Sequence, residues 1–199
     1  MNRNFETVAP ISVDSESTHS AMSLLRDAGI VLAASVLVAI SAHVSVPLFF
    51  TPVPVTLQPF AVVLLGLLLS PRLALGTMIA YLAEGAAGLP VFTPFGLGGT
   101  AQLFGPTGGY LLSYPVVAPL VSYLWRKGSR SFSRGLVVAG LGDVIILTLG
   151  AIWLSLVTHA APLTVVSHAV LPFLPGDVLK VVGAAGIASA AVRVRWFQK

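Results

Sequence analysis

The sequence contains no cysteine and few charged residues. The absence of cysteine excludes disulfides and thiolate-bound metals, although it does not identify a cellular compartment. Charged residues make up only 9% of the chain, whereas a soluble domain averages roughly 25%, so they could not cover a water-facing surface. The chain also lacks the Gly-x-x-x-x-Gly-Lys-Ser/Thr loop that binds nucleotide phosphates, so any ATP-driven step would need a partner.

Apolar residues dominate the chain instead. They make up 56% of its 199 residues, and the mean hydropathy is +0.93. At roughly 20 residues per span plus loops, this length has room for five or six transmembrane helices in one domain. We therefore predict an all-α, polytopic membrane protein. The formal charge of +4 would suggest acidic partners in a soluble protein, but here the basic residues follow membrane topology, and no nucleic-acid partner is expected.

Six apolar segments are expected to form the transmembrane helices. They cover residues 28–50, 55–70, 72–87, 108–125, 135–157 and 176–192. The second and third meet at Ser70-Pro71-Arg72, a tight turn whose proline can open the next helix. Residues 88–107 form the longest irregular connection, and their apolar composition predicts that they pack over or into the bundle.

The basic residues predict the orientation of the six helices. With six spans, ten of the eleven fall on one side, which the positive-inside bias identifies as the cytoplasm. These ten are Arg3, Arg26, Arg72, Arg126, Lys127, Arg130, Arg134, Arg193, Arg195 and Lys199. Both termini are then cytoplasmic. The polar residues 1–23 are predicted to be a disordered cytoplasmic tail, and residues 24–199 to be the membrane-embedded, substrate-binding domain.

Asp177 and Lys180 stand out at the start of the sixth segment. Ionisable groups at membrane depth are costly and usually face an internal cavity with a function. At a spacing of three residues, the two side chains share a helix face and can pair. One interpretation is a buried ion pair that fixes helix packing. The other is a binding site, in which Lys180 and the positive end of the helix hold an anionic group while Asp177 offers an acceptor.

Other polar residues fall on the same, outer side of the predicted topology and suggest a site that opens outward. They are Gln58, Glu84, Gln102, Thr107 and Tyr110. Tyr81, Phe92, Phe95 and Tyr110 could form apolar walls for a ring-shaped ligand, although core packing explains each equally well. Asp143 lies within the fifth segment, where a structural acid is favoured over a proton relay. The histidines do not have the spacing of a ligand set, so no metal is expected.

Four ordered motifs together resemble the BioY family, the biotin-capturing S components of energy-coupling factor (ECF) transporters. The motifs are Thr-Pro-Val-Pro-Val-Thr-Leu-Gln at 51–58, Tyr-Leu-x-x-Gly-x-x-Gly-Leu-Pro-Val-Phe at 81–92, Gly-Pro-Thr-Gly-Gly-Tyr-Leu at 105–111 and Leu-Pro-Phe-x-Pro-Gly-Asp-x-x-Lys at 171–180. The resemblance implies a six-helix protein of a bacterial or archaeal cytoplasmic membrane that binds biotin from the outside and needs no cofactor of its own.

The resemblance also implies partners. Uptake in the family usually needs a transmembrane coupling subunit and two ATPase subunits, although some members are reported to work without them. In the family the coupling subunit contacts a patch of small residues on the first helix. Ala34, Ala39 and Ala42 are the candidates here. From the residues alone, the small side chains of this helix fit packing inside the bundle and packing against another subunit about equally well.

Carried onto this sequence, the resemblance implies a biotin site centred on Asp177 and Lys180. Lys180 is expected to pair with the valerate carboxylate, and Asp177 to accept a ureido N–H or to orient Lys180. Gln102 stands where a basic residue would also fit. The remaining residues expected in the pocket are Gln58, Tyr81, Glu84, Gly105, Thr107, Gly108 and Tyr110.

Two alternatives stay open. The same architecture could serve another vitamin, or the chain could be an intramembrane enzyme using Asp177, Glu84 or Asp143 as acid or base. No nucleophile–base pair or metal-ligand set is visible to support an enzyme.

Overall fold

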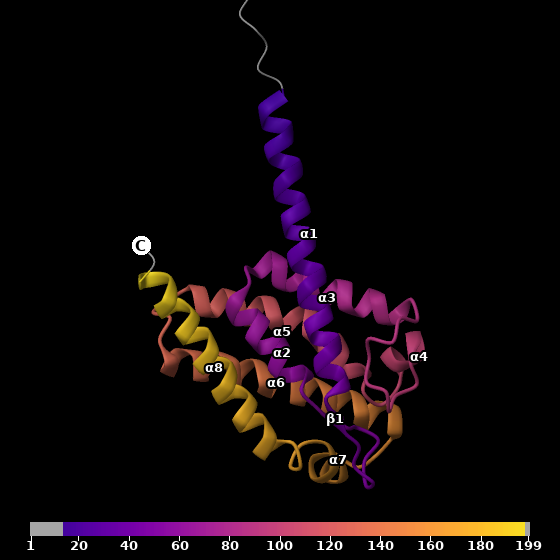
Figure 1. Cartoon of the computed structure of the whole chain (residues 1–199). Coiled ribbons are helices and arrows are strands. Elements are labelled where there is room, and N and C mark those ends of the chain that lie inside the picture. Colours follow the sequence, from indigo (N-terminus) through magenta and orange to yellow (C-terminus); the bar gives the residue numbers. More distant parts are fainter. Residues whose placement is uncertain (1–13, 198–199) are drawn as a thin grey trace, which may run out of the picture.

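In the computed structural model, residues 14–197 are described, with the side chains of residues 21–194. The described chain is a bundle of helices with one short β-ribbon (Figure 1). The elements are α1 (Asp14–His43), β1 (Ser45–Val46), β2 (Val55–Thr56), α2 (Gln58–Leu68), α3 (Pro71–Ala86), α4 (Gly99–Phe104), α5 (Gly108–Arg126), α6 (Phe132–Thr158), α7 (Pro162–Ala169) and α8 (Leu174–Phe197).

Each of the six predicted segments overlaps one helix, but the predicted end of the first segment and the predicted start of the second are wrong. The first helix stops at His43, and β1 and β2 then pair antiparallel, with Ser45 opposite Thr56. Val55 therefore begins a strand, and α2 starts only at Gln58, with a proline in its first turn. The prolines at 52 and 54 favour an extended loop between the two strands because they cannot donate backbone hydrogen bonds.

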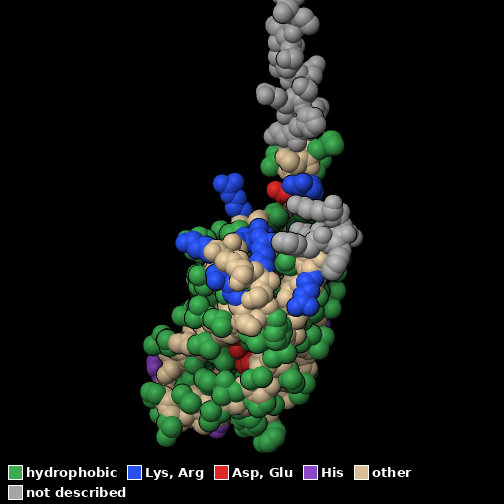
Figure 2. Space-filling model, turned by 90° about the vertical axis from the view of Figure 1, so that its left-hand side faces the viewer, with side chains coloured by type: hydrophobic (Ala, Val, Ile, Leu, Met, Phe, Trp, Pro, Cys, Tyr) green, Lys and Arg blue, Asp and Glu red, His purple; other side chains and the backbone are tan. Residues whose placement is uncertain are grey.

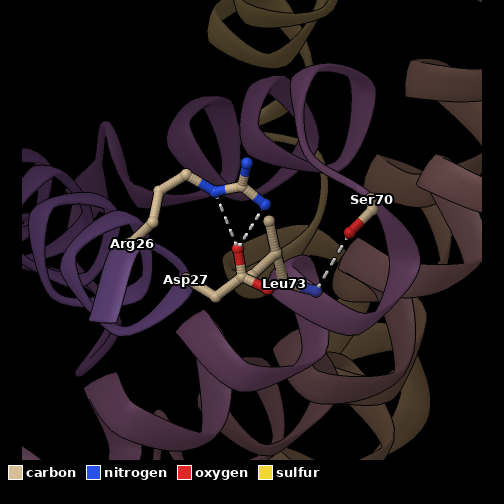
Figure 3. A network of polar contacts seen from close by, with 4 residues as sticks. All are labelled: Arg26, Asp27, Ser70 and Leu73. Atoms are coloured by element: carbon tan, nitrogen blue, oxygen red, sulfur yellow. Dashed lines mark hydrogen bonds and ion pairs between the residues drawn. The ribbon is translucent and has the colours of Figure 1, made fainter. Parts of the chain in front are cut away.

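The N-terminal end of α1 also differs from the prediction. Residues 14–23, expected within a disordered tail, belong to the helix, whereas residues 1–13 of that predicted tail lie outside the described residues. This end of α1 extends away from the bundle (Figure 1). It carries an exposed ion pair between Arg26 Nη2 and Asp27 Oδ1 at 3.1 Å (Figure 3). Because the two side chains are 72% and 44% exposed, the pair contributes little to stability.

The predicted turn at Ser70-Pro71-Arg72 is confirmed. Ser70 caps α3 by accepting a hydrogen bond from the Leu73 backbone N–H at 3.4 Å, and Pro71 occupies the first helical turn (Figure 3).

The helices differ in their capacity to cross a bilayer. Among the described residues, Ala21–His43 and Phe132–Thr158 are long and apolar enough to do so, and α7 with α8 forms a bent pair at 55°. The 11 residues of α2 span only about 16 Å, well short of a hydrocarbon core of roughly 30 Å. The long apolar helices identify the chain as a helical, membrane-embedded protein, although α2 is too short to cross the core by itself.

The centre of the bundle is α5. It packs against α6, α3 and α2, while α8 covers α6 and α2, and α1 covers α3 and α2. Small residues allow this close packing. A Cβ atom at Gly150 would overlap the ring of Tyr110, and one at Gly109 would overlap the side chain of Trp153. The glycines therefore set the distance between α5 and α6.

Two residues of the predicted partner patch, Ala34 and Ala42, pack inside the bundle, and the third, Ala39, is partly exposed. Ala34 is 7% and Ala42 is 0% exposed, and Ala39 is half-buried against the core. A partner docking on this conformation would meet larger side chains on the exposed face of α1, such as Leu32, Val36 and Ile40. At Ala34 and Ala42, the close contact that small residues allow is used within the chain, whereas Ala33 is exposed.

Lys and Arg side chains gather toward one end of the molecule (Figure 2). Among the described side chains, Arg72 begins α3, Arg126 ends α5, Arg134 begins α6 and Arg193 lies near the end of α8. Arg134 Nη2 donates to the Leu124 carbonyl at 2.7 Å, which ties α6 to α5 at this end.

Candidate functional site

A cavity of ≈ 530 Å³, its opening to solvent included, lies toward the end of the bundle opposite the basic residues. We call it the inner cavity. Helices α2, α5, α6 and α8 provide most of its wall, and the connections after β1 and α3 close it. The lining residues are Val53, Pro54, Thr56, Gln58, Pro59, Phe92, Thr93, Gln102, Thr107, Tyr110, Leu111, Tyr114, Ile146, Leu147, Phe173, Asp177 and Lys180.

Asp177 and Lys180 lie in the inner cavity as predicted, in the first two turns of α8. Lys180 Nζ donates to Asp177 Oδ1 at 2.8 Å, and the side chains are only 4% (Asp177) and 8% (Lys180) exposed. The second carboxylate oxygen, Asp177 Oδ2, is buried without a hydrogen-bond partner. Leaving a buried acceptor unpaired is costly, so this oxygen is available to a further hydrogen-bond donor.

Gln58 also lines the inner cavity, and Tyr81 holds it in place. Gln58 Nε2 donates to the Tyr81 hydroxyl at 2.6 Å, and that hydroxyl donates to the Val91 carbonyl at 3.1 Å. Tyr81 itself is fully buried behind the wall, with its ring edge-on to Phe92 at 5.4 Å between centroids. Tyr81 is therefore a positioning residue rather than a residue of the lining.

Tyr81→Phe is expected to weaken ligand binding about three- to tenfold, because it frees the Gln58 amide without emptying the core. Titration calorimetry with the ligand proposed below measures the change. Tyr123→Phe, at an exposed position on the same helix bundle, is the matched control and should leave affinity unchanged. Equal affinities of the Tyr81→Phe variant and the wild type would contradict the positioning role.

Gln102 and Thr107 meet at the wall of the inner cavity. Gln102 Nε2 donates to Thr107 Oγ1 at 2.7 Å, and Gln102 Oε1 accepts from the Gly98 N–H at 3.3 Å. Gln102 lies on α4, a short helix inside the stretch predicted to be irregular. Gly98 precedes this helix with a φ of 69°, a left-handed conformation that glycine adopts without strain.

The other residues of the Gly-Pro-Thr-Gly-Gly-Tyr motif divide their roles. Tyr110 lines the inner cavity, and its hydroxyl donates to the Ala169 carbonyl at 3.0 Å, which joins α5 to α7. Gly105 borders a neighbouring cavity and accepts from Trp153 Nε1 at 2.9 Å. Gly108 borders neither cavity, because it packs against the Leu103 carbonyl. The structure therefore does not bring Gly108 to either lining, and its contact with ligand stays a prediction.

Glu84 was also expected in the pocket, and the structure places it elsewhere. Its Oε1 accepts from the Ser35 hydroxyl at 2.9 Å, so it joins α3 to α1 and lines neither cavity. Asp143 is buried on α6, close enough to Asp177 and Lys180 to feel their charges, but outside both linings. Neither residue is positioned as an acid or base at the inner cavity.

Several lining residues were not predicted. Tyr114 lies one helical turn after Tyr110 on α5, and Ile146 and Leu147 lie one turn after Asp143 on α6. Helical spacing from a known site residue could have found Tyr114. The apolar residues carry no such signal, because every helix of the bundle is rich in them.

The arrangement combines aromatic and aliphatic walls with one charged pair and two amides. Such a cavity suits a compact ligand that is mostly apolar and has N–H donors and polar acceptors. Fold and site together define a helical membrane protein with an internal small-molecule binding site.

A family model places the chain more narrowly. The model of the BioY family matches residues 13–196. The chain belongs to the BioY family.

Individual relatives agree with this placement. The biotin transporter BioY of Thermotoga maritima is 40% identical over 84% of this chain and 94% of its own length. The probable biotin transporter BioY of Pyrococcus horikoshii is 36% identical over 76% of this chain and 87% of its own length. The crystal structure of the S-component for biotin from an ECF-type ABC transporter superposes with a TM-score of 0.78 at 28% identity, covering 86% of this chain and 93% of that one.

Proposed function

We propose that this protein captures biotin from the outer face of the membrane and serves as the S component of an ECF transporter. One observation carries the proposal: a buried Asp177–Lys180 pair with a free carboxylate oxygen, set in a cavity with mostly apolar walls. The relatives are named as a biotin transporter and a probable biotin transporter, and these names support the proposal. They also favour a transporter over the enzyme alternative.

The geometry favours a particular orientation of biotin. Because Lys180 Nζ lies 2.8 Å from Asp177 Oδ1, both residues meet the same end of a ligand. The ureido ring of biotin presents an N–H donor beside a carbonyl acceptor, whereas the carboxylate presents acceptors only. We therefore place the ureido ring at the pair, with its N–H donating to Asp177 Oδ2 and its carbonyl accepting from Lys180. This replaces the expectation that Lys180 pairs with the carboxylate.

Titration calorimetry on the purified protein tests the function. Biotin is expected to bind tightly, and a hundredfold excess of thiamine, riboflavin or folate is expected not to compete. Biotin methyl ester, which keeps the ureido ring but lacks the charge, should retain most of the affinity. No biotin binding by a folded protein would refute the proposal, and competition by another vitamin would favour the alternative S-component assignment.

We further propose six spans, with both termini in the cytoplasm of a bacterium or archaeon. The gathering of basic residues at one end supports this orientation (Figure 2). The chain offers a direct test because it has no cysteine. In intact cells, a membrane-impermeant maleimide is expected to label an Ala161→Cys variant but not a Ser129→Cys variant, both at exposed positions. Labelling of Ser129→Cys alone would reverse the orientation.

Partners follow from the same proposal. The chain has no loop for binding nucleotide phosphates, so a coupling subunit in the membrane and two ATPase subunits would supply the energy. The solved relative comes from an ECF-type ABC transporter, which supports this assembly. The burial of Ala34 and Ala42 argues against these two residues as the docking surface in the present conformation.

A further inference from the structure

Asp143 is a buried carboxyl group that the proposed binding of biotin leaves unused. It lies on α6 and is only 5% exposed, and none of the described residues donates a hydrogen bond to its side chain. Ile146 and Leu147, one turn further along the same face of α6, line the inner cavity. Asp143 therefore lies behind the cavity wall, on the side of the basic end of the molecule. A buried polar group without a partner requires an explanation.

The packing of α6 on α8 places Asp143 beside the charged pair. A Cβ atom at Gly135 would lie 3.1 Å from the Cβ of Ala185, and one at Gly140 would lie 3.9 Å from Val181 Cγ1. Since the contact moves backward along α8 as it moves forward along α6, the two helices run antiparallel. The same register places Asp143 level with the first turn of α8, where the charged pair begins.

Asp143, Asp177 and Lys180 thus form a buried cluster of two carboxyl groups and one ammonium group. The charge of Asp177 opposes a negative charge on Asp143, and the charge of Lys180 favours it. With all three groups ionised, the cluster would have a net charge of −1. An uncompensated charge in the interior is costly, whereas a single added proton makes the cluster neutral.

The surroundings of the two carboxyl groups decide where this proton binds. Asp177 accepts from Lys180 Nζ at 2.8 Å and lies in the first turn of α8, where the helix dipole favours an anion. Asp143 lies in the middle of α6 and has neither advantage. The proton therefore belongs on Asp143, and the negative charge on Asp177.

The helices around α6 offer no second cation at this level among their described residues. Helix α6 packs against α5, α8, α7 and α2, and α2 contains no titratable residue. The described arginines of α5, α6 and α8 lie at the basic end of the molecule. His168 is exposed, with its ring against that of Phe50. The titratable groups on the facing parts of these helices are Tyr110 and Tyr114 of α5, His168 of α7, and Asp177 and Lys180 of α8.

We infer that Asp143 is a proton-binding site coupled to the inner cavity, and that it takes up a proton when biotin binds. The inference rests on the proposed function for the identity of the ligand. The inner cavity opens to solvent, and water inside it screens a negative charge behind its wall. Biotin displaces this water, and the less polar surroundings favour the neutral acid. Asp143 borders neither cavity, so it acts through the charged pair and is a positioning residue.

The direction of the pH effect follows from reciprocity. If biotin favours the protonated form of Asp143, protonation of Asp143 must favour biotin by the same factor. Biotin affinity should therefore be highest at low pH and fall as the pH rises through the range in which Asp143 of the empty protein loses its proton. For a single proton, the fall is at most about tenfold per pH unit.

Titration calorimetry of the purified wild type between about pH 5 and pH 9 tests the coupling. Each titration is repeated in buffers of different ionisation enthalpy, because the difference in heat counts the protons taken up. We expect uptake of up to one proton together with an affinity that falls as the pH rises. Biotin methyl ester has no carboxyl group to titrate. It should cause the same proton uptake, which would place the proton on the protein.

Variants assign the proton to Asp143. Asp143→Asn imitates the protonated acid, so its affinity should not depend on pH and it should take up no proton. At the upper end of the pH range it should bind biotin roughly tenfold more tightly than the wild type, a gain that loss of a merely structural residue would not give. His168→Gln removes a titratable group outside the inner cavity and should keep the wild-type pH dependence.

Infrared difference spectroscopy carries the test if Asp143→Asn does not fold. The C=O band of a protonated carboxyl group should grow when biotin binds to the wild type, and it should shift in frequency in Asp143→Glu. A binding-induced band that is identical in Asp143→Glu would place the proton on another group and overturn the inference.

Two calorimetric results would also overturn it. One is the absence of proton uptake by the wild type over the whole pH range, and the other is an Asp143→Asn variant with the full wild-type pH dependence. Either result with tight binding of biotin leaves the proposed function intact. Absence of biotin binding by the folded wild type at every pH would refute that function, and the inference with it.

Discussion

Lys180→Met is expected to weaken biotin binding by about 100-fold or more, the largest effect of any single change in the inner cavity. Lys180 donates to Asp177 and, in the proposed complex, to the ligand, and a hydrogen bond to a charged group contributes about 1.5–3 kcal/mol. Its loss also leaves the Asp177 carboxylate buried without a counter-charge, at a cost of about 3–5 kcal/mol. Titration calorimetry gives the Kd, and a thermal melt reports the stability of the apo protein.

Controls distinguish loss of the site from loss of the fold. The double variant Asp177→Asn/Lys180→Met has no unpaired buried charge, so it should melt close to the wild type yet still fail to bind biotin. Glu84→Gln also removes a half-buried charge, but outside both cavities, and should keep the affinity within about twofold because the Ser35 contact survives.

A comparison of biotin with biotin methyl ester tests which end of biotin meets Lys180. If the ureido ring lies at the pair, Lys180→Met should weaken biotin and biotin methyl ester by the same factor. If Lys180 instead pairs with the carboxylate, the ester should bind poorly to the wild type. Lys180→Met should then leave the affinity for the ester unchanged. Unchanged biotin affinity in a folded Lys180→Met protein would remove the pair from the site altogether.

The helices were predictable because their signal is local. Long apolar runs and the Ser70-Pro71 cap identify a helix and its start without knowledge of the rest of the fold. The β1–β2 ribbon was missed because its pairing of Ser45 with Thr56 depends on how the chain returns over the bundle. The helical start of α1 was missed because residues 14–23 are polar, and polarity alone was read as disorder.

The site was predicted in part for the same reason. Asp177 and Lys180 can be identified as candidate site residues from the sequence because charged residues are rare in membrane helices. Glu84 is also a charged residue in a membrane helix, yet its side chain bonds to α1. It is offset from Tyr81 by only about 60° around the axis of α3. Because α3 packs against both α1 and α5, this small offset is enough to change the neighbouring helix. Which neighbour a helix face meets is set by tertiary packing. The bond between Gln58 and Tyr81, 23 residues apart, is likewise invisible in the sequence.

Gly109→Ala is expected to destabilise the protein by about 3 kcal/mol, although it adds a single methyl group. The new Cβ atom would overlap the Trp153 side chain and lie 2.7 Å from the Leu149 carbonyl oxygen. Neither partner can move easily, because the Leu149 carbonyl is part of the α6 backbone and the Trp153 indole N–H donates a hydrogen bond to the Gly105 carbonyl. Helices α5 and α6 would have to separate at the level of the inner cavity, so the melting temperature and biotin affinity should both fall.

Glycine-to-alanine substitutions at two other positions are expected to stabilise the protein instead. At Gly186, no atom beyond its chain neighbours and the backbone of its own helix lies within 4 Å of the added Cβ, and at Gly140 the nearest such atom is Val181 Cγ1 at 3.9 Å. Alanine is favoured over glycine in a helix by roughly 0.8–1.0 kcal/mol, so these two variants should melt at or above the wild-type temperature. A Gly109→Ala protein as stable as the Gly186→Ala protein would show that α5 and α6 do not pack as closely as described. The contrast isolates helix contact as the cause, because the chemical change is identical at all three positions.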